Sequence, residues 1–461
     1  MRIRKLLRVR FVVDPFTEQE KIMAELTPMM QKYMETKEQY KDCILFYRLG
    51  DFYEMFFDDA LVASKELEIT LTGKSCGLEE RAPMCGIPYH AVEGYLSKLV
   101  SRGYKVAICE QVEDPKLAKG LVKREVIRVV TPGTNLNVQS LEAGKNNYLL
   151  SIAYTPDGIG ISAADVTTGD YYVTEVEDLK KLNDELMKYE PSEIICNEAF
   201  LVSGFDVNDL KSRLHISVNE LESHMFDDDG CRRILMKHFK VNTLIGLGVE
   251  EFPTGLLAAG ALLQYLYDTQ KTDLEHFTHI YPYLTSKYML LDSSTRRNLE
   301  LTETLREKQK RGSLLWVLDK TKTAMGARLL RNYIEQPLIE KDEMEKRLDA
   351  IQELNQDSIS RDEIREYLNP IYDLERLLSK VTYKTANPRD LIAFRNSLQM
   401  LPPIKTVLSA FEKEELTKIR EQIDGLEDIY QLIDEAIIDE PPLSIREGGM
   451  IKDQFDETID R

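Results

Sequence analysis

The stretch at residues 46–56, Phe-Tyr-Arg-Leu-Gly-Asp-Phe-Tyr-Glu-Met-Phe, constrains the fold more than any other part of this chain. Gly50 and Asp51 separate two runs rich in aromatic residues, and a Gly-Asp pair between apolar segments is typical of a two-residue β-hairpin turn. One strand should arrive through residues 44–48, and the next should leave through residues 52–56. We therefore interpret the N-terminal part of the chain as an α/β domain built around this hairpin.

The second strand should carry Phe52 and Glu54 on one face, because successive side chains of a strand alternate between faces. Tyr53 and Met55 should lie on the opposite face. The simplest interpretation is an edge strand in which Phe52 belongs to the core and Glu54 lies in water. A binding role for an aromatic ring beside a carboxylate is the alternative, and the segments that follow favour it.

Three longer segments follow the hairpin. They are Arg81-Ala-Pro-Met-Cys-Gly-Ile-Pro-Tyr-His90, then Val106-Ala-Ile-Cys-Glu-Gln-Val112 with Asp114-Pro115, and then Arg124-Glu-Val-Ile-Arg-Val-Val-Thr-Pro-Gly-Thr134. Together with the Gly-Asp-Phe-Tyr-Glu of the hairpin, they closely resemble the N-terminal mismatch-recognition domain of the MutS family of bacterial DNA mismatch repair proteins. The resemblance covers residues 23–461.

The resemblance implies that the partner is double-stranded DNA with mismatches or small insertion/deletion loops, and that Phe52 is a wedge. A mispaired base stacks poorly, so inserting a ring beside it costs less than the roughly few kcal/mol per step of a sound duplex. The duplex should then kink. Glu54 would hydrogen-bond a ring nitrogen of the displaced base, and an acceptor nitrogen requires a proton on one of the two partners.

Further residues are candidates for supporting contacts to the DNA. Leu49 on the hairpin turn and Ile87 in the Gly-Ile-Pro loop are expected beside the wedge. Basic residues would contact phosphates, which position a protein on DNA without specifying sequence. The basic candidates are Lys74, Arg81, Lys98, Arg102 and Lys105.

The net charge of −19 argues at first sight against nucleic acid, but the charge is unevenly distributed. Residues 1–130 hold 21 Lys and Arg against 20 Asp and Glu, so the acidity lies in the remainder of the chain. An acidic chain can still present a locally basic groove. The composition therefore permits DNA binding without indicating it.

We divide the chain into domains from the changes in its pattern of predicted strands and helices and from the resemblance. The predicted fold class is multidomain: an α/β mismatch-recognition domain, a ribonuclease-H-like α/β connector domain, and an incomplete all-α core/lever domain. The predicted segments are an N-terminal extension at 1–22, recognition domain at 23–134, linker at 135–146, connector at 147–255, helical core at 256–440, and the start of a truncated clamp region at 441–461.

The connector domain raises an enzymatic alternative. Its strands are expected at residues 148–154, 158–165 and 170–176, with a helix at 179–189. Ribonuclease-H-like nucleases hold two metal ions with acidic residues on adjoining strands, and Asp165 is the one suitably placed carboxylate. A metal-dependent nuclease that uses Asp165 is therefore one alternative function. A protein-docking adaptor without DNA contact is the other.

Cofactor sites are not predicted within these residues. Gly73-Lys74-Ser75 has the tail of a phosphate-binding loop, but residue 68 is glutamate where that loop needs its first glycine. The resemblance implies ATP and Mg²⁺ for a complete family member, together with a homodimer, a MutL-type partner bound through the connector, and a cytoplasmic, nucleoid-associated location. We expect this chain to be a fragment without catalysis of its own and without a metal site.

Beyond residue 255 the pattern becomes helical. The leucines and other apolar residues of 305–335 recur at the spacing of a helix core, with Ser313 as a cap, and Asn387-Pro388-Arg389-Asp390 is typical of a helix start. The six cysteines have no Cys-x-x-Cys pairs and are expected to be reduced thiols. No apolar run approaches the roughly 18 residues of a membrane helix.

Overall fold

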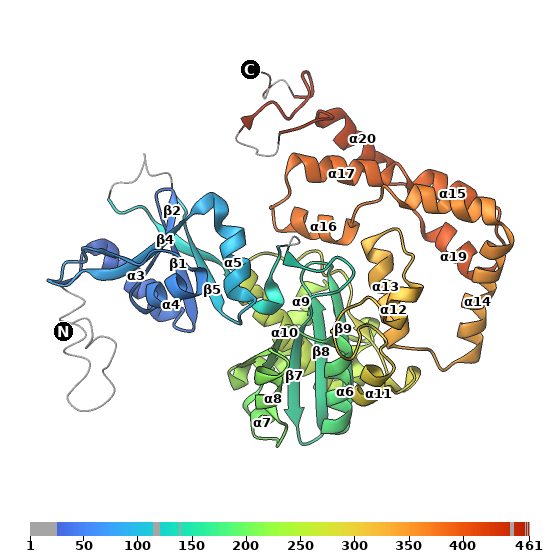
Figure 1. Ribbon diagram of the computed structural model, residues 1–461, viewed down its shortest axis with the longest axis horizontal. Coiled ribbons are helices and arrows are strands. Elements are labelled where there is room, and N and C mark those ends of the chain that lie inside the picture. The colour runs from blue at the N-terminus through green and yellow to red at the C-terminus, as the bar shows by residue number, and fades with distance from the viewer. Residues whose placement is uncertain are drawn as a thin grey trace.

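The computed structural model describes residues 25–113, 120–137, 140–442, 447–456, 458 and 460. The predicted extension at residues 1–22 and the Asp114-Pro115 motif lie outside them. Figure 1 shows three regions: a blue α/β region at one side, a green α/β region in the middle and an orange helical region. We call them the N-terminal, middle and helical regions. This order agrees with the predicted fold class.

The N-terminal region is built on one six-stranded sheet with the order β3-β4-β2-β1-β5-β6. The predicted hairpin lies at its centre as β1 and β2. The strands are β1 Cys43–Leu49, β2 Phe52–Phe56, β3 Thr72–Lys74, β4 Ala82–Pro88, β5 Lys105–Gln111 and β6 Arg124–Val130. The helices are α3 Pro28–Gln39, α4 Phe57–Leu67 and α5 Val92–Val100.

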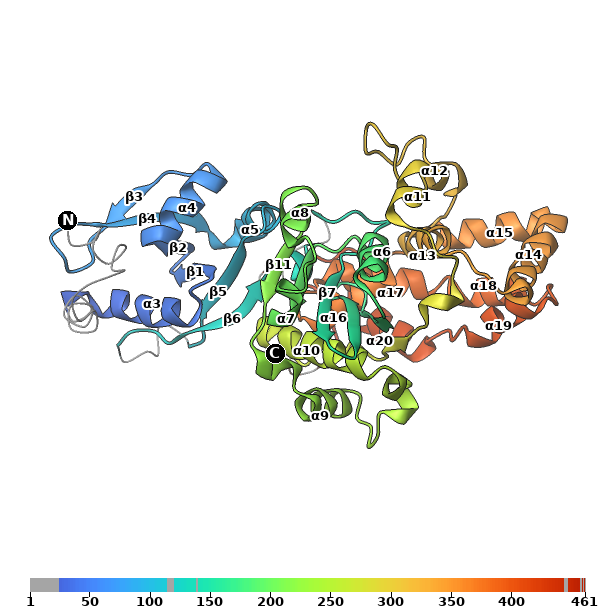
Figure 2. The same cartoon turned by 90° about the horizontal axis from the view of Figure 1, so that it is seen from below.

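Both faces of this sheet carry an apolar core. Figure 2 shows α3 and α4 on opposite sides of β1 and β2. Met55 is buried on the face that α4 and α5 cover. On the other face Tyr33 of α3 packs edge-on against Tyr47 and Phe56, with ring centroids 5.4 and 4.9 Å away. These rings pack the hairpin against α3, whereas Gly50, Asp51 and Phe52 at its turn are exposed.

The middle region has a second six-stranded sheet, with the order β11-β10-β7-β8-β9-β12. Its strands β7, β8 and β9 pair antiparallel, while β10 runs parallel to β7 and β11 parallel to β10. This combination agrees with the predicted ribonuclease-H-like fold. The strands are β7 Leu149–Thr155, β8 Gly158–Asp165, β9 Asp170–Val176, β10 Glu193–Cys196, β11 Ser217–Glu220 and β12 Tyr281–Pro282. The helices are α6 Leu179–Tyr189, α7 Glu198–Leu201, α8 Val207–Ser212, α9 Asp228–His238 and α10 Pro253–Gln270.

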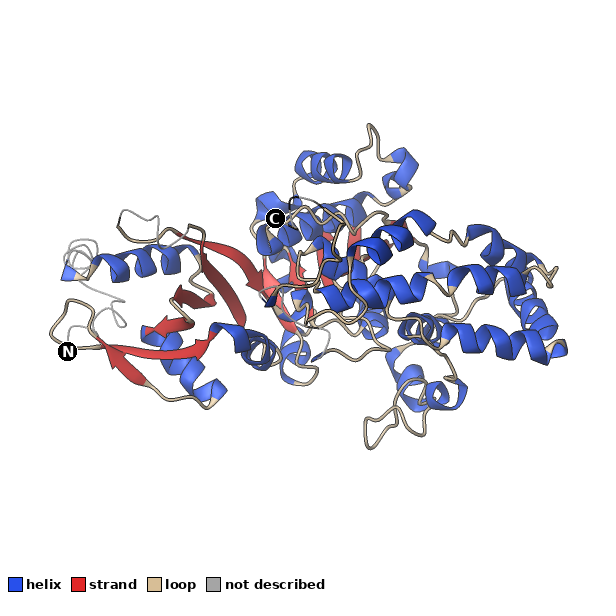
Figure 3. Ribbon diagram, turned by 90° about the horizontal axis from the view of Figure 1, so that it is seen from above, coloured by secondary structure: helices blue, strands red, loops and turns tan. Residues whose placement is uncertain are grey.

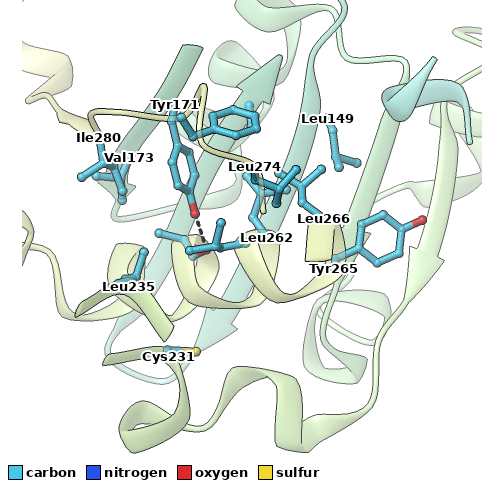
Figure 4. Packing of buried hydrophobic residues seen from close by; sticks show 14 of the residues in the cluster. Leu149, Tyr171, Val173, Cys231, Leu235, Leu262, Tyr265, Leu266, Leu274 and Ile280 are labelled. Carbon is cyan, nitrogen blue, oxygen red and sulfur yellow. Dashed lines mark hydrogen bonds between the residues drawn. The ribbon is translucent and has the colours of Figure 1, made fainter. Parts of the chain in front are cut away.

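Helix α10 forms the core of the middle region against the sheet. Figure 4 shows Tyr171 of β9 pointing toward Leu262 of α10, and the Tyr171 hydroxyl donates a hydrogen bond of 2.5 Å to the carbonyl of Ala259. Gly160 of β8 lets this helix approach, because a Cβ there would lie 2.0 Å from the Thr254 carbonyl oxygen. The core thus extends through α10 to β12, beyond the boundary predicted at residue 255, because the apolar face of α10 packs on the connector sheet.

The turn Thr131–Thr134 joins the first two regions, and Glu193 of β10 holds it. This carboxylate is fully buried. One oxygen accepts hydrogen bonds from the Thr131 hydroxyl and, at 3.0 Å, from the Gly133 amide. The other accepts bonds from the side chains of Asn219 at 2.9 Å and Tyr265 at 2.7 Å. Glu193 therefore fastens the N-terminal region to the second sheet.

The helical region holds residues 142–145 of the linker predicted at 135–146. Arg376 donates hydrogen bonds of 3.2 and 2.9 Å to the carbonyls of Glu142 and Lys145. Arg328 donates one of 2.9 Å to the carbonyl of Ala143. Both arginine side chains are buried, so the linker runs through a packed junction of the middle and helical regions.

The helical region continues the chain, and Figure 3 shows the red strands gathered in the other two regions. Two predicted caps are confirmed: the Ser313 hydroxyl accepts from the Trp316 amide at 3.2 Å, and Asn387 forms a capping box with Asp390. The helices are α11 Ser293–Asn298, α12 Leu314–Leu318, α13 Ala324–Glu335, α14 Lys341–Gln356, α15 Ser358–Leu368, α16 Leu374–Thr382, α17 Pro388–Leu398, α18 Leu401–Leu408, α19 Glu414–Gln422 and α20 Glu427–Ala436.

The apolar residues predicted as a core face in residues 305–335 are mostly exposed. Leu315 is buried, but Leu314, Val317, Leu318 and Leu329 are not. The prediction of a buried face is wrong for these four residues, because no element among the described residues covers them. Among the described residues, no helix is both long and apolar enough to cross a membrane.

Candidate functional site

The hairpin turn is the start of the candidate site. Leu49 pairs with Phe52 and Tyr47 with Glu54 in the antiparallel register, which leaves Gly50 and Asp51 as the two turn residues. Gly50 has a φ of +59°, a left-handed conformation that glycine adopts without steric cost. The hairpin therefore forms as the Gly-Asp signal predicted, with Phe52 as the first residue after the turn.

Arg48 and Tyr89 hold the turn from the side. The Arg48 Nε donates a hydrogen bond of 2.5 Å to the Gly50 carbonyl, and its guanidinium lies 3.8 Å from the centroid of the Tyr89 ring. The Tyr89 amide donates to the Asp51 carbonyl at 3.0 Å. These contacts tie the turn to the end of β4, so its position does not depend on the two strands alone.

The face below the turn is anchored in the core. Tyr53 is buried, and its hydroxyl donates a hydrogen bond to the Glu110 carboxylate, which also pairs with Arg48 at 3.2 Å. Burial and the contact with Glu110 raise the pKa of Tyr53 well above its ordinary value, so the phenol stays a neutral donor. Met55 is fully buried on the same face.

The opposite face presents Phe52 and Glu54 together. The Phe52 side chain is 46% exposed, so the interpretation that places it in the core is wrong. Phe56, two positions beyond Glu54 on that face, is buried. The strand thus changes from a covered to an open surface within five residues. An apolar ring next to a rigid turn and outside the core is the distinctive feature of the site.

Glu54 has a charged partner from a different strand. Its Oε2 lies 2.5 Å from the Nζ of Lys74, and only 17% of the Glu54 side chain is exposed. Strand β4 lies between β2 and β3, so the contact spans two strand pairings. The same ammonium lies 5.5 Å from the centroid of Phe56. Lys74 therefore lies over this face of the sheet beside Glu54 and Phe56.

Gly86 keeps the space beside the pair open. It lies opposite Glu54 in the β2–β4 register. A Cβ at this position would lie 3.6 Å from the Glu54 Cγ and 3.9 Å from the Phe52 Cδ1. Sequence reasoning did not single out this residue, although a glycine inside a strand indicates a close approach.

The other predicted site residues do not gather around Phe52. Leu49 lies beside it, but Ile87 is fully buried in the α4 and α5 core, because it pairs with Tyr53 and shares that face. Arg81 is exposed and packs against Gly73 near β3, and Lys98 is exposed on α5. Arg102 pairs with Glu66 at 2.5 Å, and Lys105 pairs with Asp42 at 3.0 Å. Because Lys105 faces Cys43 at the start of β1, it lies at the opposite end of the sheet from the hairpin turn.

Asp165, the candidate nuclease residue, is fully buried at the end of β8. Its Oδ1 accepts from the amide and hydroxyl of Thr167 at 2.8 and 2.7 Å, and its Oδ2 accepts from Asn146 and the Asn147 amide at 3.0 and 2.9 Å. A carboxylate saturated in this way stabilises the turn and has no open side for a metal ion. No group of three potential metal ligands occurs among the described residues, and the six cysteines are free and buried.

Comparisons with known proteins identify the same regions. Models of MutS domain I, domain II and domain III match residues 27–139, 147–278 and 294–460. The second match ends beyond residue 255, in agreement with the packing of α10.

Individual relatives carry the name DNA mismatch repair protein MutS. The protein of Lachnoclostridium phytofermentans is 66% identical over 438 residues, which are 95% of this chain and 47% of that protein. Those of Ruminiclostridium cellulolyticum and Acetivibrio thermocellus are 52% and 51% identical, each over 95% of this chain and 50% of the relative. The chain spans about half the length of the curated relatives it matches. With three successive domains matched over most of its length, the chain belongs to the MutS family.

Proposed function

We propose that this chain recognises mispaired or unpaired bases in double-stranded DNA by inserting Phe52, within the mismatch repair system to which its relatives are assigned. The observation that carries the proposal is the exposed Phe52 ring beside Glu54, on a hairpin whose other face is buried. The proposal does not depend on a metal ion or on a catalytic residue of this chain.

The geometry of the hairpin supports a wedge. A ring that enters a base stack must be rigidly held, because a mobile side chain loses rotational freedom on insertion. Arg48 and Tyr89 hold the turn that precedes Phe52. Unstacking a sound base step costs on the order of a few kcal/mol, and a mispaired step costs less, so the weakened step is selected by its deformability.

Glu54 supplies a polar contact to the displaced base. It lies two residues after Phe52 on the same face, about 7 Å further along the strand. Its ion-pair partner, Lys74, would lie near the phosphates of a bound duplex. Arg81 and Lys98 are exposed and available for phosphate contacts, whereas the ion pairs of Arg102 and Lys105 make these two residues weaker candidates.

The remaining assignments concern the longer protein. We propose that such a protein hydrolyses ATP with Mg²⁺ outside these residues, acts as a homodimer, docks a MutL-type partner on the middle region, and works in the cytoplasm on the nucleoid. The family membership supports these assignments.

Fluorescence anisotropy with a G·T heteroduplex and its matched homoduplex tests the proposal. The wild-type chain should prefer the heteroduplex, and Phe52→Ala should abolish that preference. Leu61→Ala is the matched control, because Leu61 has a similar exposure of 42% but lies on α4, on the other side of the sheet. Equal affinity of the wild-type chain for both duplexes would contradict the proposal, and Mg²⁺-dependent cleavage of either would favour a nuclease.

A further inference from the structure

The contact between Lys74 and Glu54 has a consequence for base readout, and the inference drawn from it rests on the proposed function. The two charged atoms are 2.5 Å apart, with 33% of the Lys74 and 17% of the Glu54 side chain exposed. A partly covered pair of this kind is held more firmly than a surface pair, because less water competes for either charge. In the DNA-free chain Glu54 is therefore fixed beside Phe52.

The path of the chain makes this contact specific. Lys74 is the last residue of β3, and it pairs with Ala82 of β4, while Glu54 pairs with Gly86 of the same strand. Gly86 adds no side chain beside the Glu54 carboxylate, since a Cβ at this position would lie 3.6 Å from the Glu54 Cγ and 3.9 Å from the Phe52 Cδ1. The register thus places Phe52, Glu54 and Lys74 on the same face of the sheet, with Lys74 in contact with Glu54.

A bare carboxylate would oppose insertion. Phosphates line both sides of a DNA groove, and they repel a negative charge that enters with the wedge. An ammonium next to the carboxylate reduces this repulsion and can itself take a phosphate when the carboxylate moves to the base.

We propose that Lys74 is a positioning residue for base readout: it holds and neutralises the Glu54 carboxylate beside Phe52, and it releases that carboxylate to the displaced base as its own ammonium takes a phosphate. Lys74 then affects the discrimination between mispaired and matched DNA, and it does so through Glu54. A residue that only contacts a phosphate would weaken binding to both duplexes equally.

A double-mutant cycle on the full 461-residue chain separates these roles. The variants are Lys74→Met, Glu54→Gln and the double variant, and the probes are a G·T heteroduplex and its matched homoduplex over a range of salt concentrations. Lys74→Met should reduce the ratio of the two affinities about fivefold, the size expected for a pair worth about 1 kcal/mol. In the Glu54→Gln background the same change should leave the ratio unaltered, and Lys74→Arg should restore most of the wild-type ratio.

Two controls exclude general effects. Lys181→Met removes a lysine of α6, in the middle region, from its ion pair with Glu177, and it should not change the ratio. The melting temperature of Lys74→Met should stay close to that of the wild-type chain. If Lys74 had a merely structural role, its removal would lower the melting temperature whether or not Glu54 is present.

The outcomes distinguish this inference from the proposed function. An equal loss for both duplexes in Lys74→Met, or an undiminished effect in the Glu54→Gln background, would overturn the positioning role while Phe52→Ala still abolishes the preference. A wild-type chain without any preference for the heteroduplex would overturn the proposed function, and the positioning role with it.

Discussion

Glu54 of the first six-stranded sheet and Glu193 of the second have opposite surroundings. Glu54 in the first sheet has one close cation among the described residues and lies on the same face as an exposed ring. Glu193 in the second sheet is fully buried, and both of its oxygens accept two hydrogen bonds each. A saturated carboxylate cannot accept a ligand without leaving several buried donors unpaired. A carboxylate with one exchangeable partner can change partners.

A ligand can therefore bind to the carboxylate of the first sheet more readily than to those of the second sheet. Asp165 resembles Glu193, because its two oxygens accept hydrogen bonds from Thr167 in the turn after β8 and from Asn146 and Asn147 before β7. The polar groups of the second sheet therefore stabilise the fold and join the regions. The first sheet leaves part of one face uncovered, and that part carries the residues proposed to meet DNA.

Removal of the Glu193 side chain should have the largest effect. Glu193→Ala leaves the Gly133 amide, Asn219 and Tyr265 without their acceptor, which should cost ~3–5 kcal/mol of stability. Differential scanning calorimetry measures the loss. Glu220→Ala, at the exposed end of β11, is the control and should stay near the wild type. A small effect of Glu193→Ala would mean that this sheet is not held by its buried carboxylate.

The two faces of β2 should respond differently to truncation. Met55→Ala creates a cavity in a fully buried site and should cost ~2–5 kcal/mol. Phe52→Ala removes a larger side chain from an exposed site and should cost no more than about 0.5 kcal/mol. Urea denaturation of both variants gives the comparison. A large loss in Phe52→Ala would show that the ring serves the fold and would weaken its assignment as a wedge.

Asp170, close to Asp165, offers a pH-dependent test in the second sheet. Burial, and then the negative charge of Asp165, raise the pKa of Asp170 from 3.8 to about 6. The folded state therefore favours the protonated carboxyl. This contribution is fully present below about pH 4 and is lost as the pH rises through about 6.

Asp170→Asn cannot ionise and should not show this loss. Its stability relative to the wild type should rise by on the order of 2 kcal/mol between pH 4 and pH 7. Thermal melts of both proteins across this range measure the difference. A difference that stays constant with pH would mean that Asp170 titrates alike in the folded and unfolded states.

Local sequence signals predicted much of both sheets. The Gly-Asp turn, the alternation in residues 52–56 and the bounds of β8, β9 and α6 depend on neighbouring residues, so they could be found without the fold. The alternation of side chains along the strand places Phe52 on one face, but it does not show what covers that face. The exposure of Phe52 could therefore not be predicted. The predicted burial of Leu314 and Leu329 was wrong for the same reason. Their spacing indicates an apolar face, and the structure leaves that face exposed.

Contacts that cross several strands could not be predicted. The pair of Lys74 and Glu54 depends on the register of β4 with both β2 and β3. The same register places Ile87 opposite Tyr53 and therefore in the core, where the sequence suggested a place beside the wedge. The extent of the hydrophobic core of the middle region likewise depended on α10. From the sequence alone, the apolar residues of α10 predicted a part of the helical domain.

Gly86 gives the smallest expected effect and the sharpest test of the open face. Gly86→Ala adds a methyl group at ordinary contact distance from Glu54 and Phe52, so stability should change by no more than about 0.5 kcal/mol. Gly86→Val places a branched side chain between the two strands on this face and should lower the affinity for a G·T heteroduplex more than the affinity for matched DNA. Gly94→Val on α5, where an added Cβ would meet no atom within 4 Å, is the control for DNA binding. If Gly86→Val kept the full preference for the heteroduplex, the space beside Glu54 would not be needed for readout, and the difference between the two sheets would then rest on Phe52 alone.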